Sequence, residues 1–316
     1  MKEDPFSDVL ALANARSVVS GGFLAGGDWA IRFPPPDRVK FFIAARGACW
    51  LSIEGEESIR FSAGETILLT AARGFTLASD PALPALDAVA LYGDDGNRII
   101  NLGTAEEFFF LGGHVRLDSA SGNLLIDNLP PVIHLRAGSV DADAIRWLID
   151  RLAREHHIGL PGSDFAATQL AQLVFLQILR AYLASTDTMT AGRLRAISDP
   201  RIAPAIRMMH ADPARAWHLT ELARACAMSR TVFASYFKSV AGLAPLTYLT
   251  QWRMHLAERA LRESNAPLSE LSEMLGYSSE SAFSVAFKRV TGKAPKRYRS
   301  AARRAVSRDL VLPRAH

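Results

Sequence analysis

An internal repeat in the last third of the chain limits its possible folds more than any other feature. The first half of the repeat matches residues 49 positions apart, namely Leu219, Thr220, Leu222, Cys226, Met228 and Ser229 with Leu268, Ser269, Leu271, Leu275, Tyr277 and Ser278. One residue is then inserted, and the second half matches residues 50 positions apart, namely Phe233, Phe237, Lys238, Gly242, Pro245 and Tyr248 with Phe283, Phe287, Lys288, Gly292, Pro295 and Tyr298. The chain therefore contains two copies of one structural unit.

The second copy predicts two helices joined by a tight turn. Ser269 is placed to cap a short first helix, and Gly276 supplies the left-handed residue that a sharp reversal requires. Ser279 is placed to cap a second helix, in which Phe283 and Phe287 are four residues apart and face the same side. This is the pattern of a helix-turn-helix, and the repeat predicts two of them.

The tail of each copy points to a known family. From Gly276 to Arg299 the chain follows G-Y-x-S-x-x-x-F-x-x-x-F-K-x-x-x-G-x-x-P-x-x-Y-R, and residues 199–300 thereby resemble the AraC/XylS transcription regulators. The resemblance implies two recognition helices that enter successive major grooves on one face of double-stranded DNA. It also implies RNA polymerase as a partner.

The charge distribution agrees with a DNA-binding C-terminal part. From Asp199 onward there are 19 Lys and Arg against 9 Asp and Glu, whereas residues 1–198 hold 17 against 23. A basic domain gains affinity for DNA by releasing counterions from the phosphates, and an acidic neighbour does not compete for them.

The candidate base-reading residues are the neighbours of the inward-facing phenylalanines. They are Arg230, Thr231, Ala234 and Ser235 in the first recognition helix and Glu280, Ser281, Ser284 and Val285 in the second. Arg230 is the best candidate for a guanine contact, Glu280 could accept from a cytosine amino group, and Val285 could contact a thymine methyl. The basic residues beyond these turns are expected to contact phosphates, and they are Lys238, Lys288, Arg289, Lys293, Lys296, Arg297 and Arg299.

Residues 15–117 predict short strands. Over 39–46 an apolar row of Val39, Phe41, Ile43 and Ala45 alternates with Lys40, Phe42, Ala44 and Arg46, and over 49–53 Cys49, Leu51 and Ile53 alternate with Trp50 and Ser52. Glycine-containing turns separate these runs. The pattern favours a small antiparallel barrel or jelly roll.

The stretch Phe61–Ser79 resembles the second conserved stretch of cupins, as found at the N-terminus of many AraC-type regulators. Cupin enzymes hold a metal with histidines on these strands, but no histidine occurs here before His114, and Phe42 and Phe75 stand near the expected ligand positions. We therefore expect no metal, no cofactor and no catalysis.

The barrel is expected to bind a small molecule. The candidate effector-binding residues are the large or polar groups on predicted strands, namely Trp29, Arg32, Lys40, Arg46, Trp50 and His114, each of which could instead be structural or surface-exposed. Cys49 and Cys226 are too few for a disulfide framework and are expected in cores, although a redox role for Cys49 stays open.

Two helices are predicted after the strands, from Asp141 to about residue 158 and from Asp164 to Ala184. The apolar stripe of the second, which includes Leu170, Val174 and Ile178, is wider than one barrel contact needs, so these helices are expected to form a homodimer contact. No uninterrupted apolar stretch is long enough to span a membrane, and no signal peptide is evident. This predicts a cytoplasmic protein without a membrane segment.

The predicted fold class is α+β, with a cupin-like β-barrel and helical dimerisation segment followed by an all-α double helix-turn-helix domain. The predicted boundaries are 1–184 for the sensing and dimerisation domain, 185–198 for a linker, 199–305 for the DNA-binding domain and 306–316 for a C-terminal tail. The predicted function is a sequence-specific transcription regulator of the AraC type, controlled by a small molecule or a stress signal. Activation is the commoner role in that family. The alternatives are a cupin-type enzyme with a DNA-binding tail and an effector-independent DNA binder.

Overall fold

The chain folds into two compact units that do not follow one another simply along the sequence. The computed structural model describes residues 4–93, 99–103, 105–118, 122–127, 129–138, 142–158, 160–184 and 191–311, without the side chains of 142, 156–158 and 305–311. The barrel unit comprises residues 16–116 and 129–185. The helix-turn-helix unit comprises residues 1–15, 117–128 and 186–315.

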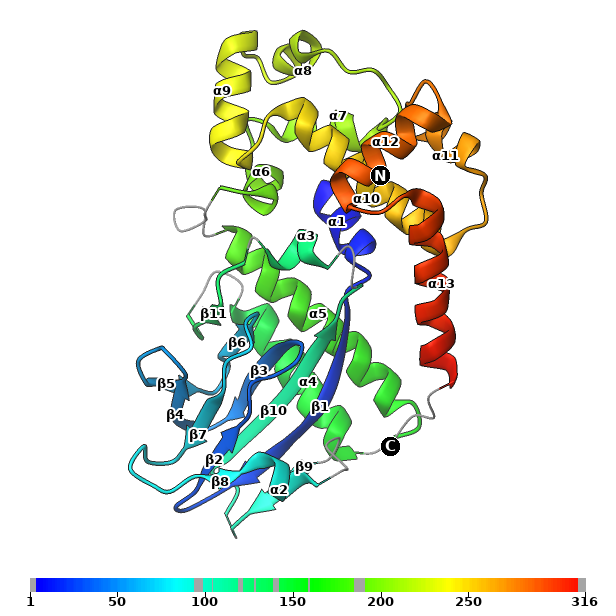
Figure 1. The fold of residues 1–316 in the computed structure, drawn as a ribbon. Coiled ribbons are helices and arrows are strands. Elements are labelled where there is room, and N and C mark those ends of the chain that lie inside the picture. Colours follow the sequence, from blue (N-terminus) through cyan, green and yellow to red (C-terminus); the bar gives the residue numbers. More distant parts are fainter. Residues whose placement is uncertain are drawn as a thin grey trace. The chain divides into compact units, whose positions relative to one another are not determined.

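The barrel unit is built from two sheets (Figure 1). The six-stranded sheet has the order β11-β6-β3-β10-β1-β9, with β11 at Val132–Leu135, β6 at Thr66–Leu69, β3 at Val39–Arg46, β10 at Phe108–Arg116, β1 at Arg16–Ala25 and β9 at Ile99–Leu102. The five-stranded sheet has the order β5-β4-β7-β2-β8, with β5 at Ile59–Ser62, β4 at Ala48–Ile53, β7 at Phe75–Ala78, β2 at Ala30–Phe33 and β8 at Leu86–Asp87. The neighbouring strands β1 and β9 are parallel, as are β2 and β8, and the other neighbours in these two orders are antiparallel.

Aromatic side chains fill the space between the sheets. Phe23, Phe42, Phe75 and Phe110 lie in one buried cluster, and the rings of Phe42 and Phe75 are 4.2 Å apart. Phe42 and Phe75, which stand near the metal-ligand positions of cupin enzymes, are thus core residues. Cys49 is fully buried in the same cluster, as predicted, and burial raises the pKa of its thiol to about 12.

Three helices complete the barrel unit, namely α2 at Ala88–Tyr92, α4 at Ala142–Ile158 and α5 at Ser163–Ala184. Helices α4 and α5 pack on each other, and α5 packs on β1 (Figure 1). The inner stripe of α5 is buried as predicted, with Val174 and Ile178 fully covered. Large apolar side chains remain exposed on these helices, including Trp147 at 63%, Phe165 at 73% and Leu173 at 43% exposure.

The helix-turn-helix unit is entirely helical in its described residues. Its helices are α1 at Pro5–Ala13, α3 at Asn123–Ile126, α6 at Arg193–Ser198, α7 at Ala203–Ala211, α8 at Leu219–Ala225, α9 at Arg230–Ala241, α10 at Pro245–Glu263, α11 at Leu268–Met274, α12 at Glu280–Thr291 and α13 at Pro295–Val311. The two repeats build separate cores, each centred on its phenylalanine pair. Among the described residues, no helix combines the length and the hydropathy needed to cross a membrane.

The predicted linker 185–198 contains a helix in its second half. Leu194 and Ala196 of α6 are fully buried in the core of the first repeat. The segment shows no clear apolar stripe in the sequence because a six-residue helix presents only two or three inward positions. Residues 185–190 lie outside the described part of the chain, as do residues 312–316 of the predicted tail, whose first residues continue α13.

Candidate nucleic-acid interface

The second helix of each repeat begins and ends in the same way. Ser229 caps α9 by accepting from the amide of Val232 at 3.3 Å, and Ser279 caps α12 by accepting from the amide of Ala282 at 3.1 Å. Both helices end at a glycine in the left-handed region, Gly242 and Gly292.

The phenylalanine pairs orient both helices. Phe233 and Phe237 of α9, like Phe283 and Phe287 of α12, are fully buried. Because these residues are four apart, they bury one face of each helix and leave the opposite face to solvent. The prediction of two helix-turn-helices from the repeat is therefore confirmed. Ser269 is not a cap, however, because α11 begins one residue earlier, at Leu268, with Pro267 at the N-cap position.

The predicted base-reading residues share the solvent face of these two helices. Arg230, Thr231 and Ser235 are exposed on α9, with Ala234 half-buried. On α12 the exposed residues are Glu280, Ser281 and Val285, with Ser284 half-buried. Val285 is 68% exposed, so its methyl groups are accessible on the outer face of α12.

Two further residues of this surface were missed by the sequence reasoning. Val232 is 51% exposed on α9, and the matching residue of the second repeat, Ala282, is exposed on α12. Each directly precedes a buried phenylalanine, at positions 233 and 283, which made an inward orientation plausible. The 100° rotation per residue nevertheless carries both side chains off the buried face.

The basic residues are divided by their surroundings. The exposed ones are Lys238, Lys288, Arg289, Lys293, Lys296 and Arg297, as a phosphate-contacting role requires. Arg299 differs, because it is half-buried and its Nη2 donates to the carbonyl of Ala266 at 2.5 Å. This hydrogen bond joins α13 to the turn before α11, so Arg299 has a structural contact that the sequence did not indicate.

The long helix α10 connects the two repeats and also holds the loop between α7 and α8. Arg253 Nε donates to the carbonyl of Pro213 at 2.5 Å, and its Nη2 donates to that of Arg215 at 2.9 Å. Gly276 of the second repeat meets the same loop, since a Cβ built on it would lie 1.9 Å from the carbonyl oxygen of Ala214. The loop is thus in contact with both repeats, which restricts their relative motion.

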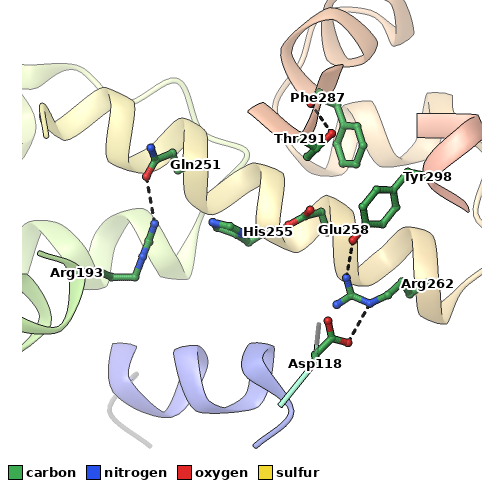
Figure 2. A network of polar contacts seen from close by, with 9 residues as sticks. All are labelled: Asp118, Arg193, Gln251, His255, Glu258, Arg262, Phe287, Thr291 and Tyr298. Carbon is green, nitrogen blue, oxygen red and sulfur yellow. Dashed lines mark hydrogen bonds and ion pairs between the residues drawn. The ribbon is translucent and has the colours of Figure 1, made fainter. Parts of the chain in front are cut away.

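A polar network along α10 ties in residues from distant parts of the sequence (Figure 2). Arg262 Nε lies 3.2 Å from Asp118 Oδ2, and its Nη1 donates to the Tyr298 hydroxyl at 2.9 Å. Arg193 of α6 donates to Gln251 at 3.4 Å, and His255 Nδ1 lies 3.0 Å from Glu258. Burial lowers the pKa of His255, with the hydrogen bond to Glu258 opposing it.

Helix α1 is anchored in the same unit by a buried histidine. His210 Nδ1 lies 3.1 Å from Asp8 of α1, and Nε2 lies 2.9 Å from the Tyr248 hydroxyl. The imidazole also stacks on Trp252 with ring centroids 3.7 Å apart. Burial lowers the pKa of His210, and the contact with Asp8 opposes this shift.

Only two of the six candidate effector residues come together. Lys40 and His114 both line a pocket of about 700 Å³ in the barrel unit. Trp29 fills the core, whereas Arg32 and Arg46 are exposed and pair with Asp87 at 4.0 Å and Glu106 at 3.2 Å. The half-buried Trp50 lies under the Arg60 guanidinium at 5.6 Å. Within the described residues, no group of three or more His, Cys, Asp or Glu is arranged to hold a metal ion.

Comparison with known proteins gives two family matches and several similar full-length chains. Residues 4–184 match a cupin family, and residues 222–301 match a helix-turn-helix domain family. A putative AraC-like transcription regulator of Streptomyces antibioticus is 40% identical over 94% of this chain and 98% of its own length. The HTH-type transcriptional regulator AlkR of Acinetobacter baylyi is 29% identical over 86% of this chain and 91% of its own.

A solved structure is also similar in part. The DNA-binding domain of AdpA in complex with a target DNA is 29% identical, with a TM-score of 0.33, over 34% of this chain and 96% of that one. The curated relatives named above are transcription regulators and not enzymes.

Proposed function

Because this chain belongs to the AraC-like DNA-binding transcription regulators with an N-terminal cupin domain, we propose that α9 and α12 are its two recognition helices and that the barrel unit controls them. One observation carries the first part of this proposal. Both helices carry the same cap, the same buried phenylalanine pair and the same exposed N-terminal face, 50 residues apart.

The length of the helix that connects the two repeats suits DNA with both reading sites on one face of the duplex. Helix α10 has 19 residues and spans about 28 Å at 1.5 Å per residue, close to the ~34 Å of one duplex turn. We therefore propose that α9 and α12 enter successive major grooves.

The two helices offer different chemistry to the bases. Arg230 presents a guanidinium suited to the O6 and N7 atoms of guanine, and no other long polar side chain accompanies it on the exposed face of α9 up to Ser235. The second helix presents the Glu280 carboxylate and the Val285 methyl groups, which suit a cytosine amino group and a thymine methyl. Small side chains elsewhere on both faces favour a contribution from DNA shape.

Variants of Arg230 and Lys288 test these assignments. Arg230→Ala is expected to cost about 1–3 kcal/mol at the preferred site and to relax sequence preference at one position. Lys288→Ala is expected to weaken specific and non-specific DNA alike and to lower the slope of log K against log salt by about 1. Gel-shift titrations at several salt concentrations, on a selected site and on scrambled DNA, measure both effects.

Arg46→Ala serves as the matched control because it removes an exposed arginine of the barrel unit. Equal losses by Arg230→Ala on both DNAs, or unchanged binding by either variant, would contradict the assignment.

The barrel unit is proposed to sense a small molecule and to dimerise through α4 and α5. The pocket beside Lys40 and His114 supports the first role. The exposed Trp147 of α4 and the exposed Phe165 and Leu173 of α5 support the second, since these two helices pack on each other and exposed large apolar groups can form interaction surfaces. Activation of transcription through RNA polymerase is the outcome that we expect from the family.

A further inference from the structure

The pocket of the barrel unit lies at the end of two rows of inward-facing side chains. On β3 the row is Lys40, Phe42 and Ala44. Their partners on the neighbouring strand β10 are His114, Gly112 and Phe110, in that order. Phe42 and Phe110 belong to the core between the sheets. Because alternate residues of a strand share one face, Lys40 and His114 continue the core-facing rows at the pocket. Their side chains are the first polar groups beyond the packed aromatic interior.

Lys40 is a cation in apolar surroundings. Its Nζ lies 5.6 Å from the ring centre of Phe33 and 5.9 Å from that of Phe75. Among the residues that the structure describes, the Lys40 ammonium group has neither a hydrogen bond nor an ion pair, and the Asp37 carboxylate lies 3.6 Å from Arg38 Nε instead. Burial lowers the pKa of Lys40, because apolar surroundings solvate its charge poorly, and the Asp37 carboxylate opposes this shift. An anion placed beside Nζ would stabilise that charge.

His114 adds a neutral hydrogen-bond donor to the same end of the pocket. Arg116 Nε lies 3.4 Å from His114 Nε2, and because arginine can only donate, Nε2 is the acceptor. Burial and the neighbouring cations lower the pKa of His114 to about 4, so the imidazole is neutral at pH 7. The proton of the neutral ring then resides on Nδ1, and this tautomer can donate to a ligand but adds no negative charge.

The remaining walls of the pocket are mostly apolar, with Ser20, Asp37 and Arg38 as the other polar side chains besides Tyr92. The walls include Phe33, Pro34, Pro35, Tyr92 and Phe110. Tyr92 uses its hydroxyl to donate to the carbonyl of Gly22 at 2.7 Å, which leaves the edge of its ring among the lining groups. The volume of about 700 Å³ lies in the range of small-molecule sites, which is roughly 300–1,000 Å³.

We propose that this pocket binds a small organic monocarboxylate with a flat or aliphatic apolar body, the carboxylate lying at Lys40 and His114. The inference rests on the proposed sensing function, because it names the chemical class of the effector. A charge-assisted hydrogen bond from Lys40 supplies most of the discrimination against the corresponding amide. The proline and aromatic walls bury the apolar body.

The test compares acids with amides of the same shape on the full-length protein. Isothermal titration calorimetry with benzoate against benzamide, and with hexanoate against hexanamide, measures the preference for the charged group. We expect at least one acid to bind with at least about tenfold higher affinity than its amide, the usual weight of a charge-assisted hydrogen bond. Lys40→Met, which keeps an apolar side chain of similar length, should remove that preference, and Lys40→Arg should retain part of it.

Arg46→Met is the matched control, since it removes an exposed cation from the same strand outside the pocket. Equal binding of acid and amide, an unchanged acid preference in Lys40→Met, or the absence of acid binding at millimolar concentration would each overturn the proposal.

The same samples separate this proposal from the sensing function. If an acid binds through Lys40 but leaves the DNA affinity in gel shifts and the transcription of a reporter gene unchanged, the ligand class stands and the sensing function fails. If no acid binds while another compound changes the DNA affinity, the sensing function stands and the ligand class fails.

Discussion

Gly276→Ala is the substitution for which the structure gives the clearest expectation. Gly276 has a φ of 73°, and an added Cβ would lie 1.9 Å from the Ala214 carbonyl oxygen, which is backbone and cannot rotate away. The positive φ costs an alanine about 1–2 kcal/mol, and forcing the loop apart costs about 1–3 kcal/mol more. We expect the helix-turn-helix unit to lose roughly 2–5 kcal/mol of stability.

Gly292 provides a control for the backbone term alone. It has a φ of 74°, and nothing lies within 4 Å of the position of an added Cβ. Gly292→Ala should therefore cost only about 1–2 kcal/mol. The first repeat shows that an alanine can adopt a positive φ at this turn, because Ala227, which matches Gly276, has a φ of 52°. The close approach to Ala214, and not the turn itself, is what demands glycine at position 276.

Native-state hydrogen exchange of the amides in α11 and α12 measures both variants locally, without assuming that the two units unfold together. A matching gel-shift titration should show that Gly276→Ala weakens binding to a full site more than Gly292→Ala does, because the loop contacts both repeats. Equal destabilisation by the two substitutions would refute the role given to the contact with Ala214.

Two further predictions concern pH and assembly. Burial lowers the pKa values of His210 and His255, so below about pH 6.5 the folded unit binds fewer protons than the unfolded chain. The stability of this unit should therefore be full above about pH 6.5 and should fall as the pH drops below that value. Hydrogen exchange at pH 7.5 and 5.5 measures the difference, and greater stability at pH 5.5 would contradict the expectation. Phe165→Glu should shift the protein from dimer to monomer in light scattering, because it places a charge on an exposed apolar position of α5. Arg154→Glu, at an exposed and already charged position of α4, should not, and a monomeric parent protein would contradict the proposed dimer contact.

The helix-turn-helix pattern was predictable because its determinants are local. Phe283 and Phe287, the Ser279 cap and the glycine at 292 lie within 14 residues of one another, and each has a fixed meaning in a helix. Val232 was missed because an apolar residue next to a buried phenylalanine suggests a core position, although the 100° step per residue turns it away from the buried face.

The effector candidates were harder to choose because the sequence of a strand indicates only which residues share a face of the sheet. Ile31 and Phe33 face the core, so the alternation alone would have placed Arg32 outside, and Leu51 does the same for Trp50. The pairing of Lys40 with His114 could not be predicted, since it depends on the register between strands far apart in the sequence.

The association of α1 with the helix-turn-helix unit was also not predictable. It depends on the contact of Asp8 with His210 of α7, whose ring stacks on Trp252 of α10. Nothing in the N-terminal sequence indicates a partner 202 residues away.

The anchoring of α1 and of the segment at Asp118 has a practical consequence for modular exchange between regulators. The amide of Asp118 donates to the carbonyl of Ala13. Helix α1 and the segment at Asp118 both contact the C-terminal helices. In the sequence, α1 precedes β1, which begins at Arg16, and Asp118 follows β10, which ends at Arg116, and these two residues are paired. A hybrid gene spliced at residues 185–198 would give the recognition helices a foreign N-terminal segment and leave α1 without His210. Splicing that preserves function must transfer three pieces of the chain together.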